Sequence, residues 1–371
     1  MAVAASPPPL AWYGSSFAYY DDPPAPTDEE LDAAAERARE ERLAGFAPEQ
    51  FGPQPGGDEG SGVVLGRFLP VHDGHRYLIE FARAHVADLH VFVRVEPGDP
   101  VPWAVRRDWL AELYPGVTLT AVQDGPDASE RWVAAILDRV RPDFLFAGEA
   151  YGAGLARRLG ARFVAVDRSA IPVSGTQVRD DPWAFERYLP PPVRAWYARR
   201  VCIVGAESTG KTTLAARLAE HYRTVWVPER LRAIGSGAGA VSPADISLAA
   251  HGQRVAEDVL ARRASRVLIC DTGVLSVRMW SERLFGTAPG WLREAAGEAT
   301  ADLYLLTAPD IPFAGDDGRN TPAERREFHA AWERELARLG RPYTLIDGPS
   351  QQRFTRAVEV VDALLQERPV R

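Results

Sequence analysis

Short apolar runs alternate with stretches of helical spacing along most of this chain. The runs that we interpret as strands are residues 63–65, 89–95, 118–122, 143–149, 161–167, 201–204, 224–230, 266–272, 301–307 and 342–346. Helices are expected at residues 77–82, 106–114, 130–140, 193–199, 214–219 and 354–365. Strands that alternate with helices form parallel sheets, and ligands bind at the carboxyl ends of such strands. The pattern therefore predicts an α/β fold with doubly wound parallel sheets.

The length of the chain predicts more than one domain. Its 371 residues exceed the roughly 250–300 at which single hydrophobic cores stop growing. We expect an N-terminal extension and linker, partly disordered, over residues 1–60, because this segment ends in a stretch rich in Gly and Pro. A first α/β domain is expected over residues 61–192 and a second over residues 193–371, since three consecutive prolines mark the boundary.

The strand at residues 201–204 runs into the pattern G-x-x-x-x-G-K-T, and a helix follows. This is the strand, loop and helix context in which a phosphate-binding P-loop forms. Glycines at both ends of the loop allow the backbone to turn, so that its N–H groups point at phosphate oxygens. The residues expected to bind the phosphates of ATP are Gly205, Glu207, Ser208, Thr209, Gly210, Lys211, Thr212 and Thr213.

Lys211 is the only lysine in the chain. A compact ammonium fits beneath a phosphate chain where a planar guanidinium does not, so this lysine supports the P-loop over an ordinary Gly-rich turn. Lys211 is expected to reach the β- and γ-phosphates, and the Thr212 hydroxyl to hold Mg²⁺. The later apolar strand that ends in Asp271 is Walker-B-like. Its carboxylate can hold Mg²⁺ or accept the proton of an attacking hydroxyl.

A second phosphate-binding pattern lies in the expected first domain. The strand at residues 63–65 runs into G-x-F-x-P-x-H-x-G-H, which begins at Gly66 and includes Phe68, and a helix starts directly after it. Two imidazoles at a helix start can both face a ligand held against the strand end. We therefore predict that His72 and His75 bind an anion, and that Gly74 lets a phosphate approach between the two rings.

Residues 174–179 read S-G-T-Q-V-R. Ser174 and Thr176 place hydroxyls at the opening of a helix, where they and the backbone N–H groups can bind phosphate oxygens. Arg179 can pair with the β- or γ-phosphate. Alone, this pattern is usually a capped helix. After H-x-G-H in an α/β chain, it predicts a triphosphate site.

These two patterns resemble the nucleotidylyltransferase family, and specifically its nicotinamide mononucleotide (NMN) adenylyltransferase branch. A P-loop kinase domain directly behind them resembles the bifunctional NadR type, and the similarity covers roughly residues 62–365. The resemblance implies a Rossmann-like nucleotidylyltransferase domain followed by a P-loop kinase domain, both with parallel sheets. It also implies phosphorylation of ribosylnicotinamide by ATP, then attack of NMN on the α-phosphate of ATP to give NAD and pyrophosphate. His72 and His75 would stabilise the charge that develops in this transfer.

The resemblance also implies substrate contacts. Trp132 lies where the family has an aromatic residue near the nicotinamide ring, and a cationic pyridinium stacks favourably on indole; a core Trp on a helix face is the alternative. Glu149 follows a strand end, where it either contacts ligand or caps a helix. Glu229 matches the family's acidic residue close to the riboside, with Arg232 three residues on. The family commonly carries D-T-D where this chain has D-T-G at residues 271–273.

The Gly-containing loop at residues 310–317 and the arginines that follow it resemble a nucleotide-kinase lid, which closes over the transferring phosphoryl group. Arg319 and Arg325 are the expected contributors, and a solvated, charged helix is the alternative for Arg325. In the first domain, Arg106 and Arg107 are expected at the surface.

Composition narrows the classes of function. The net charge of −8 and the pI near 5.5 argue against a general nucleic-acid binder. The sequence shows no membrane-spanning run and no signal peptide, and its two cysteines lie in apolar strands as buried thiols. We therefore expect a soluble, cytoplasmic protein.

The expected partners are small nucleotides: ATP as substrate, NMN and ribosylnicotinamide, with Mg²⁺ as cofactor. The oligomeric state stays open, a homo-oligomer included. Two alternatives remain for the function. One is a phosphopantetheine adenylyltransferase joined to a dephospho-coenzyme A kinase. The other is a nucleotide-sensing regulator.

Overall fold

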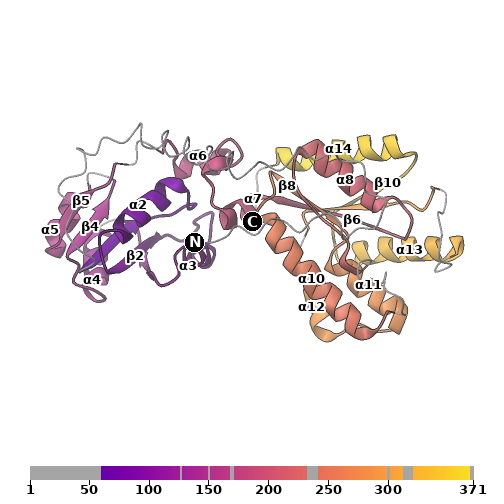
Figure 1. The fold of residues 1–371 in the computed structure, drawn as a ribbon, viewed down its shortest axis with the longest axis horizontal. Helices are drawn as coiled ribbons and strands as arrows, with labels where there is room; N and C mark the ends of the chain where they lie inside the picture. The colour runs from indigo at the N-terminus through magenta and orange to yellow at the C-terminus, as the bar shows by residue number, and fades with distance from the viewer. Residues whose placement is uncertain are drawn as a thin grey trace, which may run out of the picture. The chain divides into compact units, whose positions relative to one another are not determined.

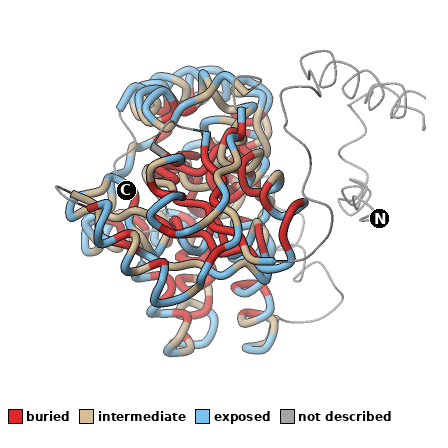
Figure 2. The backbone as a smooth tube through the Cα atoms, turned by 90° about the vertical axis from the view of Figure 1, so that its left-hand side faces the viewer, coloured by how far each residue is buried: buried red, intermediate tan, exposed pale blue. Residues whose placement is uncertain are grey.

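The computed structural model describes residues 60–125, 128–148, 151–167, 171–231, 241–298, 301–311 and 321–367. The expected N-terminal extension, apart from residue 60, lies outside the described residues. Two five-stranded sheets follow one another along the chain, each accompanied by helices (Figure 1). The most buried residues are those of the inner strands and of the helix faces that meet them, while outer helix turns are exposed (Figure 2).

The first sheet has the order β3-β2-β1-β4-β5. Its strands are β1 (Ser61–Gly66), β2 (Asp88–Val95), β3 (Thr118–Gln123), β4 (Phe144–Ala147) and β5 (Arg162–Ala165). All neighbours pair in parallel, and on central β1 Val64 lies beside Val91 of β2 and Phe146 of β4. Because helices cover both faces, β1 reads as a continuous apolar run rather than an alternating one.

Helices on both faces complete this first unit. Leu78 of α2 (Asp73–Arg83) and Leu110 of α3 (Trp103–Leu113) share a buried cluster with Val64. On the other face, Val63 shares a buried cluster with Ile136 of α4 (Ala128–Leu137) and Leu155 of α5 (Tyr151–Leu159). The chain continues through α6 (Gly175–Asp180), the 3₁₀ turn η3 (Glu186–Tyr188) and α7 (Pro191–Tyr197).

The second sheet has the order β10-β9-β6-β8-β7, again with parallel neighbours. Its strands are β6 (Arg199–Gly205), β7 (Trp226–Val227), β8 (Val267–Asp271), β9 (Leu303–Thr307) and β10 (Tyr343–Ile346). One face is covered by α8 (Lys211–Tyr222) and α14 (Ser350–Gln366). The other face carries α10 (Pro243–Ala261), α11 (Val274–Phe285), α12 (Gly290–Gly297) and α13 (Pro322–Arg338), as Figure 1 shows.

The predicted elements are present, with ends that differ by a few residues. Two differences have a clear cause. The strand expected at residues 224–230 is only the two-residue β7, because Pro228 has no N–H to continue the ladder. The helix expected at residues 193–199 is α7, which starts at Pro191, since proline suits the first turn of a helix.

Two further predictions concern the cysteines and membrane-spanning helices. Cys202 and Cys270 are 5% and 3% exposed, so the expectation of buried thiols is confirmed, and burial raises the pKa of both. Among the helices of the described residues, none has both the length and the apolar character that crossing a membrane requires.

Candidate active sites

The loop after β1 holds the two histidines against each other. His72 caps α2 from an extended conformation and is 2% exposed. Its ring centroid lies 3.8 Å from that of His75, and the ring of Phe68 lies 4.8 Å from His75 on the other side. A Cβ at Gly74 would come within 3.0 Å of His72 Cε1. Glycine at this position therefore lets the imidazole pair pack as one unit at the helix start.

Helix α6 packs directly on this loop. Arg179 Nη1 donates to the Leu69 carbonyl, and its Nη2 donates to Thr176 Oγ1 at 3.1 Å. A side chain on Gly175 would collide with the same Leu69 carbonyl. Ser174 caps α6, with its Oγ accepting from Gln177 N at 3.3 Å in a capping box. The two phosphate-binding patterns, far apart in the sequence, therefore meet in the fold.

A cavity of about 290 Å³ opens between the loop and α6. Its wall contains residues of both predicted patterns, namely Gly66, Phe68, His75, Thr176 and Arg179. Two further arginines line it, Arg67 and Arg94, which the sequence analysis did not single out. Arg94 stands one residue before the end of β2, at the carboxyl edge where α/β folds bind ligands, and this placement was a usable signal. Three guanidinium groups and an imidazole make the cavity suited to anionic ligands.

Trp132 and Arg94 interact with each other. The Arg94 guanidinium carbon lies 5.1 Å from the centroid of the Trp132 ring, and Trp132 Nε1 donates to the Gln123 carbonyl at 3.2 Å. Trp132 is 9% exposed and belongs to a buried cluster. The structure therefore places Trp132 in the core behind a cavity arginine. Glu149 lies outside the described residues.

Arg106 was expected at the surface, and that prediction was wrong. It is 1% exposed, whereas Arg107 is exposed as expected. Successive residues of a helix point about 100° apart, so two adjacent arginines cannot share one environment. Arg106 shares its face of α3 with buried Trp109 and Leu110, at helical spacing. This spacing was visible in the sequence.

The P-loop has the predicted conformation. Gly205 and Gly210 have φ of +140° and +79°, values that favour glycine. Lys211 is 6% exposed, and its Nζ donates to the Ala206 carbonyl at 2.8 Å. Thr209 Oγ1 donates to the same carbonyl at 2.8 Å. The ammonium therefore lies inside the curve of the loop, at the N-terminus of α8.

The two predicted metal-holding residues meet at the sheet edge. Thr212 Oγ1 donates to Asp271 Oδ2 at 2.5 Å, and Asp271 is 1% exposed at the end of β8. A hydroxyl and a carboxylate oxygen are hard donors of the kind that Mg²⁺ takes. Because β6 and β8 are neighbouring strands, this pair lies directly beside the P-loop. These two residues fit the predicted ion.

Two buried arginines hold the P-loop from outside. Arg325 of α13 is 5% exposed and donates to the carbonyls of Glu207 and Ser208, each at 3.1 Å. Arg353 of α14 is 4% exposed and donates to the Thr209 carbonyl at 3.0 Å. Sequence reasoning missed Arg353, because nothing in its neighbourhood distinguishes it from other helical arginines. Arg319 and Arg232 lie outside the described residues.

A buried amide connects the loops after β7 and β8. Gln253 of α10 is fully buried; its Oε1 accepts from Arg230 N at 3.3 Å, and its Nε2 donates to the Thr272 carbonyl at 3.4 Å. Glu229, the predicted riboside contact, is half-buried directly before Arg230. Gln253 therefore joins the loop that carries Glu229 to the loop after β8.

At Gly273, where the D-T-G sequence departs from the family's D-T-D, a carboxyl group of α10 lies close by. A Cβ at Gly273 would lie 3.2 Å from Cys202 Sγ and 3.5 Å from Glu257 Oε1. Glu257 is 5% exposed and accepts from Gln253 Nε2 at 3.1 Å. A longer side chain at position 273 would therefore point at Glu257.

Comparison with known proteins agrees with this geometry. The AAA domain family matches residues 200–353, which include the P-loop. The trifunctional NAD biosynthesis/regulator protein NadR of Escherichia coli K12 is 25% identical over 344 residues, covering 82% of this chain and 83% of that protein. NadR of Salmonella typhimurium LT2 is 24% identical, with the same shares covered. The chain is NadR-like over most of its length.

Solved NadR structures share the fold. A crystal structure of NadR protein in complex with NAD and AMP-PNP has a TM-score of 0.67 at 20% identity, covering 84% of this chain and 98% of that one. A second NadR structure, in complex with NR, has a TM-score of 0.67 at 22% identity, with shares of 85% and 98%. The predicted fold class is confirmed: a Rossmann-like unit and a P-loop unit, both with parallel sheets.

Proposed function

We propose that this chain is a bifunctional enzyme of NAD synthesis. Its P-loop unit phosphorylates ribosylnicotinamide with ATP, and its first unit transfers the adenylyl group of ATP to the resulting NMN. The observation that carries the proposal is the cavity lined by His75, Thr176 and Arg179, where two phosphate-binding patterns meet. The similarity to NadR over 82% of the chain supports both steps.

In adenylyl transfer, a phosphate oxygen of NMN attacks the α-phosphorus of ATP. A new P–O–P bond forms, and the bond from the α-phosphorus to the β-phosphate oxygen breaks and releases pyrophosphate. The attacking phosphate is already anionic, so the step requires no general base. Arg67, Arg94, Arg179 and His75 line the cavity, and their cationic groups would neutralise the phosphates as charge moves to the leaving group.

In the kinase step, a ribose hydroxyl oxygen bonds to the γ-phosphorus, the bond from the γ-phosphorus to the β-phosphate oxygen breaks, and ADP leaves. The hydroxyl proton is released, and the Asp271 carboxylate can accept it. The P-loop amides and Lys211 hold the phosphates, because the ammonium lies inside the curve of the loop. Thr212 and Asp271 would hold Mg²⁺, which neutralises phosphate charge when bound. Glu229, two residues after the end of β7, would contact the riboside.

The direct test gives purified chain Mg-ATP with ribosylnicotinamide and separates the products by chromatography. We expect NMN, NAD and pyrophosphate. A second reaction supplied with NMN isolates adenylyl transfer. NMN without NAD would leave only the kinase, and the absence of both products would overturn the proposal. Phosphopantetheine and dephospho-coenzyme A are run in parallel, since their turnover in place of the nicotinamide substrates would favour the coenzyme A alternative.

A further inference from the structure

A single buried guanidinium joins the carboxyl ends of β1 and β2. Arg106 Nη1 donates to the carbonyl oxygen of Arg67 at 2.8 Å and to that of Arg94 at 3.1 Å. The parallel ladder between these strands ends where Gly66 lies beside Val93. Arg106 therefore provides a donor to backbone carbonyls at the point where the sheet stops providing one.

Asp99 extends this link to the Arg67 side chain. Arg106 Nη2 donates to Asp99 Oδ2 at 2.7 Å, and Arg67 Nη2 donates to Asp99 Oδ1 at 2.8 Å. Burial alone would raise the pKa of Asp99, but the Glu96 N–H and the two guanidinium groups outweigh it, so the pKa lies below its usual value. The ionised carboxylate thus holds both arginines. Arg67 is fixed through its backbone and through its side chain.

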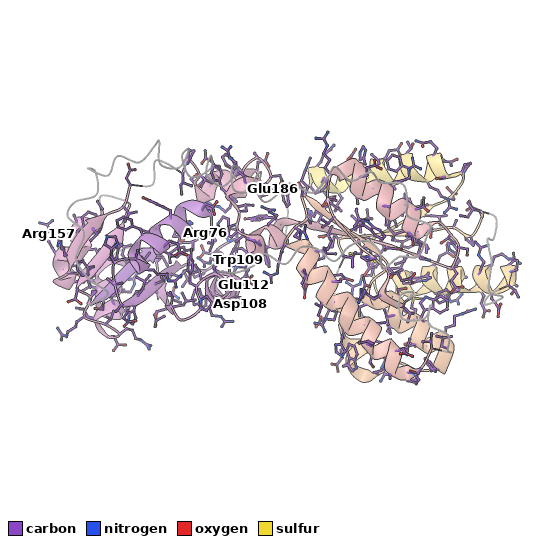
Figure 3. All side chains as sticks on the ribbon, in the orientation of Figure 1. Arg76, Asp108, Trp109, Glu112, Arg157 and Glu186 are labelled. Carbon is purple, nitrogen blue, oxygen red and sulfur yellow. The ribbon has the colours of Figure 1, made fainter. Side chains whose placement is uncertain are left out.

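Both residues whose carbonyls accept from Arg106 also line the cavity. Arg67 and Arg94 line it, while Arg106 lies in the core. On α3, Trp109 also turns inward, whereas Asp108 and Glu112 are exposed on the outer face (Figure 3). The buried face of α3 therefore contacts, through Arg106, the strand ends from which Arg67 and Arg94 line the cavity.

We propose that Arg106 is a positioning residue for adenylyl transfer, which sets Arg67 and Arg94 at the substrate phosphates. This inference rests on the proposed function of the first unit. The two cavity arginines stabilise the phosphates only if their charges lie in the correct positions. A mutation far from the reacting atoms that moves such groups by about 1 Å can lower the rate about 100-fold. Three acceptors around one planar group require a guanidinium, because an ammonium on a flexible stem cannot meet them together.

The main test is Arg106→Lys, which keeps the charge and removes the fork. We expect kcat for NAD formation from NMN to fall at least about tenfold. Riboside phosphorylation by the same chain should stay unchanged, and it serves as the internal measure of folded protein. Asp99→Asn should lower kcat in the same direction, because it removes the charge that holds Arg67. Arg107→Lys, at the exposed neighbouring position, is the matched control and should behave as wild type.

A merely structural role would lower the melting temperature and leave kcat per folded molecule unchanged. Arg106→Lys with wild-type kcat would therefore overturn the proposal. If Arg106→Lys does not fold, Asp99→Asn decides, and wild-type kcat in that variant has the same meaning.

Calorimetric titration with NMN separates this inference from the proposed function. A wild-type chain that binds NMN without forming NAD contradicts the proposed function alone. Weaker NMN binding by Arg106→Lys would then still support positioning, and equal binding would refute it. A wild-type chain that neither binds NMN nor forms NAD overturns both.

Discussion

Glu257 is a buried carboxyl group behind the loop that ends β8. Burial raises its pKa to about 7, more than the hydrogen bond from Gln253 and the nearby charge of Arg200 lower it. Arg200 Nη1 lies 3.8 Å from Glu257 Oε2; Asp258 adds a small upward shift, and Arg254 a small downward one. The ordinary value is 4.5, so between these two values the folded chain holds a proton that the unfolded chain has released.

The free energy of unfolding should therefore fall as the pH rises through this window. The folded state binds more protons there, and the shift corresponds to at most about 3 kcal/mol. Glu257→Gln keeps the acceptor for Gln253 and removes the titration. We expect the free energy of unfolding of wild type, measured with urea, to fall more than that of Glu257→Gln between about pH 5 and about pH 8. Glu359→Gln is the control, because Glu359 is an exposed residue of α14 that forms an ion pair with Arg356. An equal pH dependence in wild type and Glu257→Gln would contradict this account.

How far single residues could be predicted depended on how local their signal is. His75 and Lys211 stand in short patterns that carry their own structural context. Arg106 could have been separated from Arg107 by helical phase, which places it with Trp109 and Leu110. Arg353 carries no such signal, because all but one of its named contacts come from loops more than 40 residues away in the sequence. Long-range contacts of this kind are set by the tertiary fold and not by local sequence.

The elements themselves were largely predictable. The inner strands of each sheet are apolar runs buried on both faces, and such runs stand out wherever helices alternate with them. Both phosphate-binding loops were found because each combines a strand end, a glycine turn and a helix start. The contact of α6 with the Leu69 carbonyl was not visible locally. The sequence indicated this contact only because the two distant motifs together resemble those of one family.

In each unit, at least one buried arginine from a covering helix contacts the loops at the carboxyl edge of the sheet. In the first unit this is Arg106 of α3. In the second it is Arg353 of α14, which donates to the carbonyls of Ala308 at 3.0 Å and Gly348 at 2.7 Å, to the P-loop and to the Asp310 carboxylate. One guanidinium thus connects three strand-end loops. Since the acceptors are mostly backbone oxygens, the planar fork matters more than the charge.

Arg353→Lys should therefore weaken the hold on the P-loop and leave the first unit intact. We expect kcat/KM for ATP in riboside phosphorylation to fall about tenfold, which corresponds to about 1.4 kcal/mol, with NAD formation from NMN unchanged. Steady-state kinetics of both reactions on one preparation measures this. Arg356→Lys, an exposed neighbour on α14, should have no effect. A loss of both activities in a folded Arg353→Lys chain would show that the arginine supports the whole chain rather than the P-loop.

At the scale of the whole molecule, the proposed function requires two separate polyphosphate sites with different chemistry in one polypeptide. The first is built from guanidinium and imidazole groups, and the second from main-chain amides around the sole lysine. Lys211→Ala should lower riboside phosphorylation by at least about 100-fold and leave NAD formation from NMN unchanged. His75→Ala should do the reverse. Loss of both activities in a single folded variant would contradict two independent sites.

Mixing these two variants tests whether NMN passes between chains. Neither variant alone should convert ribosylnicotinamide to NAD, since each lacks one step. If NMN made at the P-loop site is released, the His75→Ala chain supplies it and the Lys211→Ala chain consumes it, so the mixture should form NAD. The rate should rise with the concentration of the Lys211→Ala chain, because free NMN must be captured from solution. A mixture that forms no NAD, while the Lys211→Ala chain still converts added NMN to NAD, would show that NMN made at the P-loop site is not released into solution.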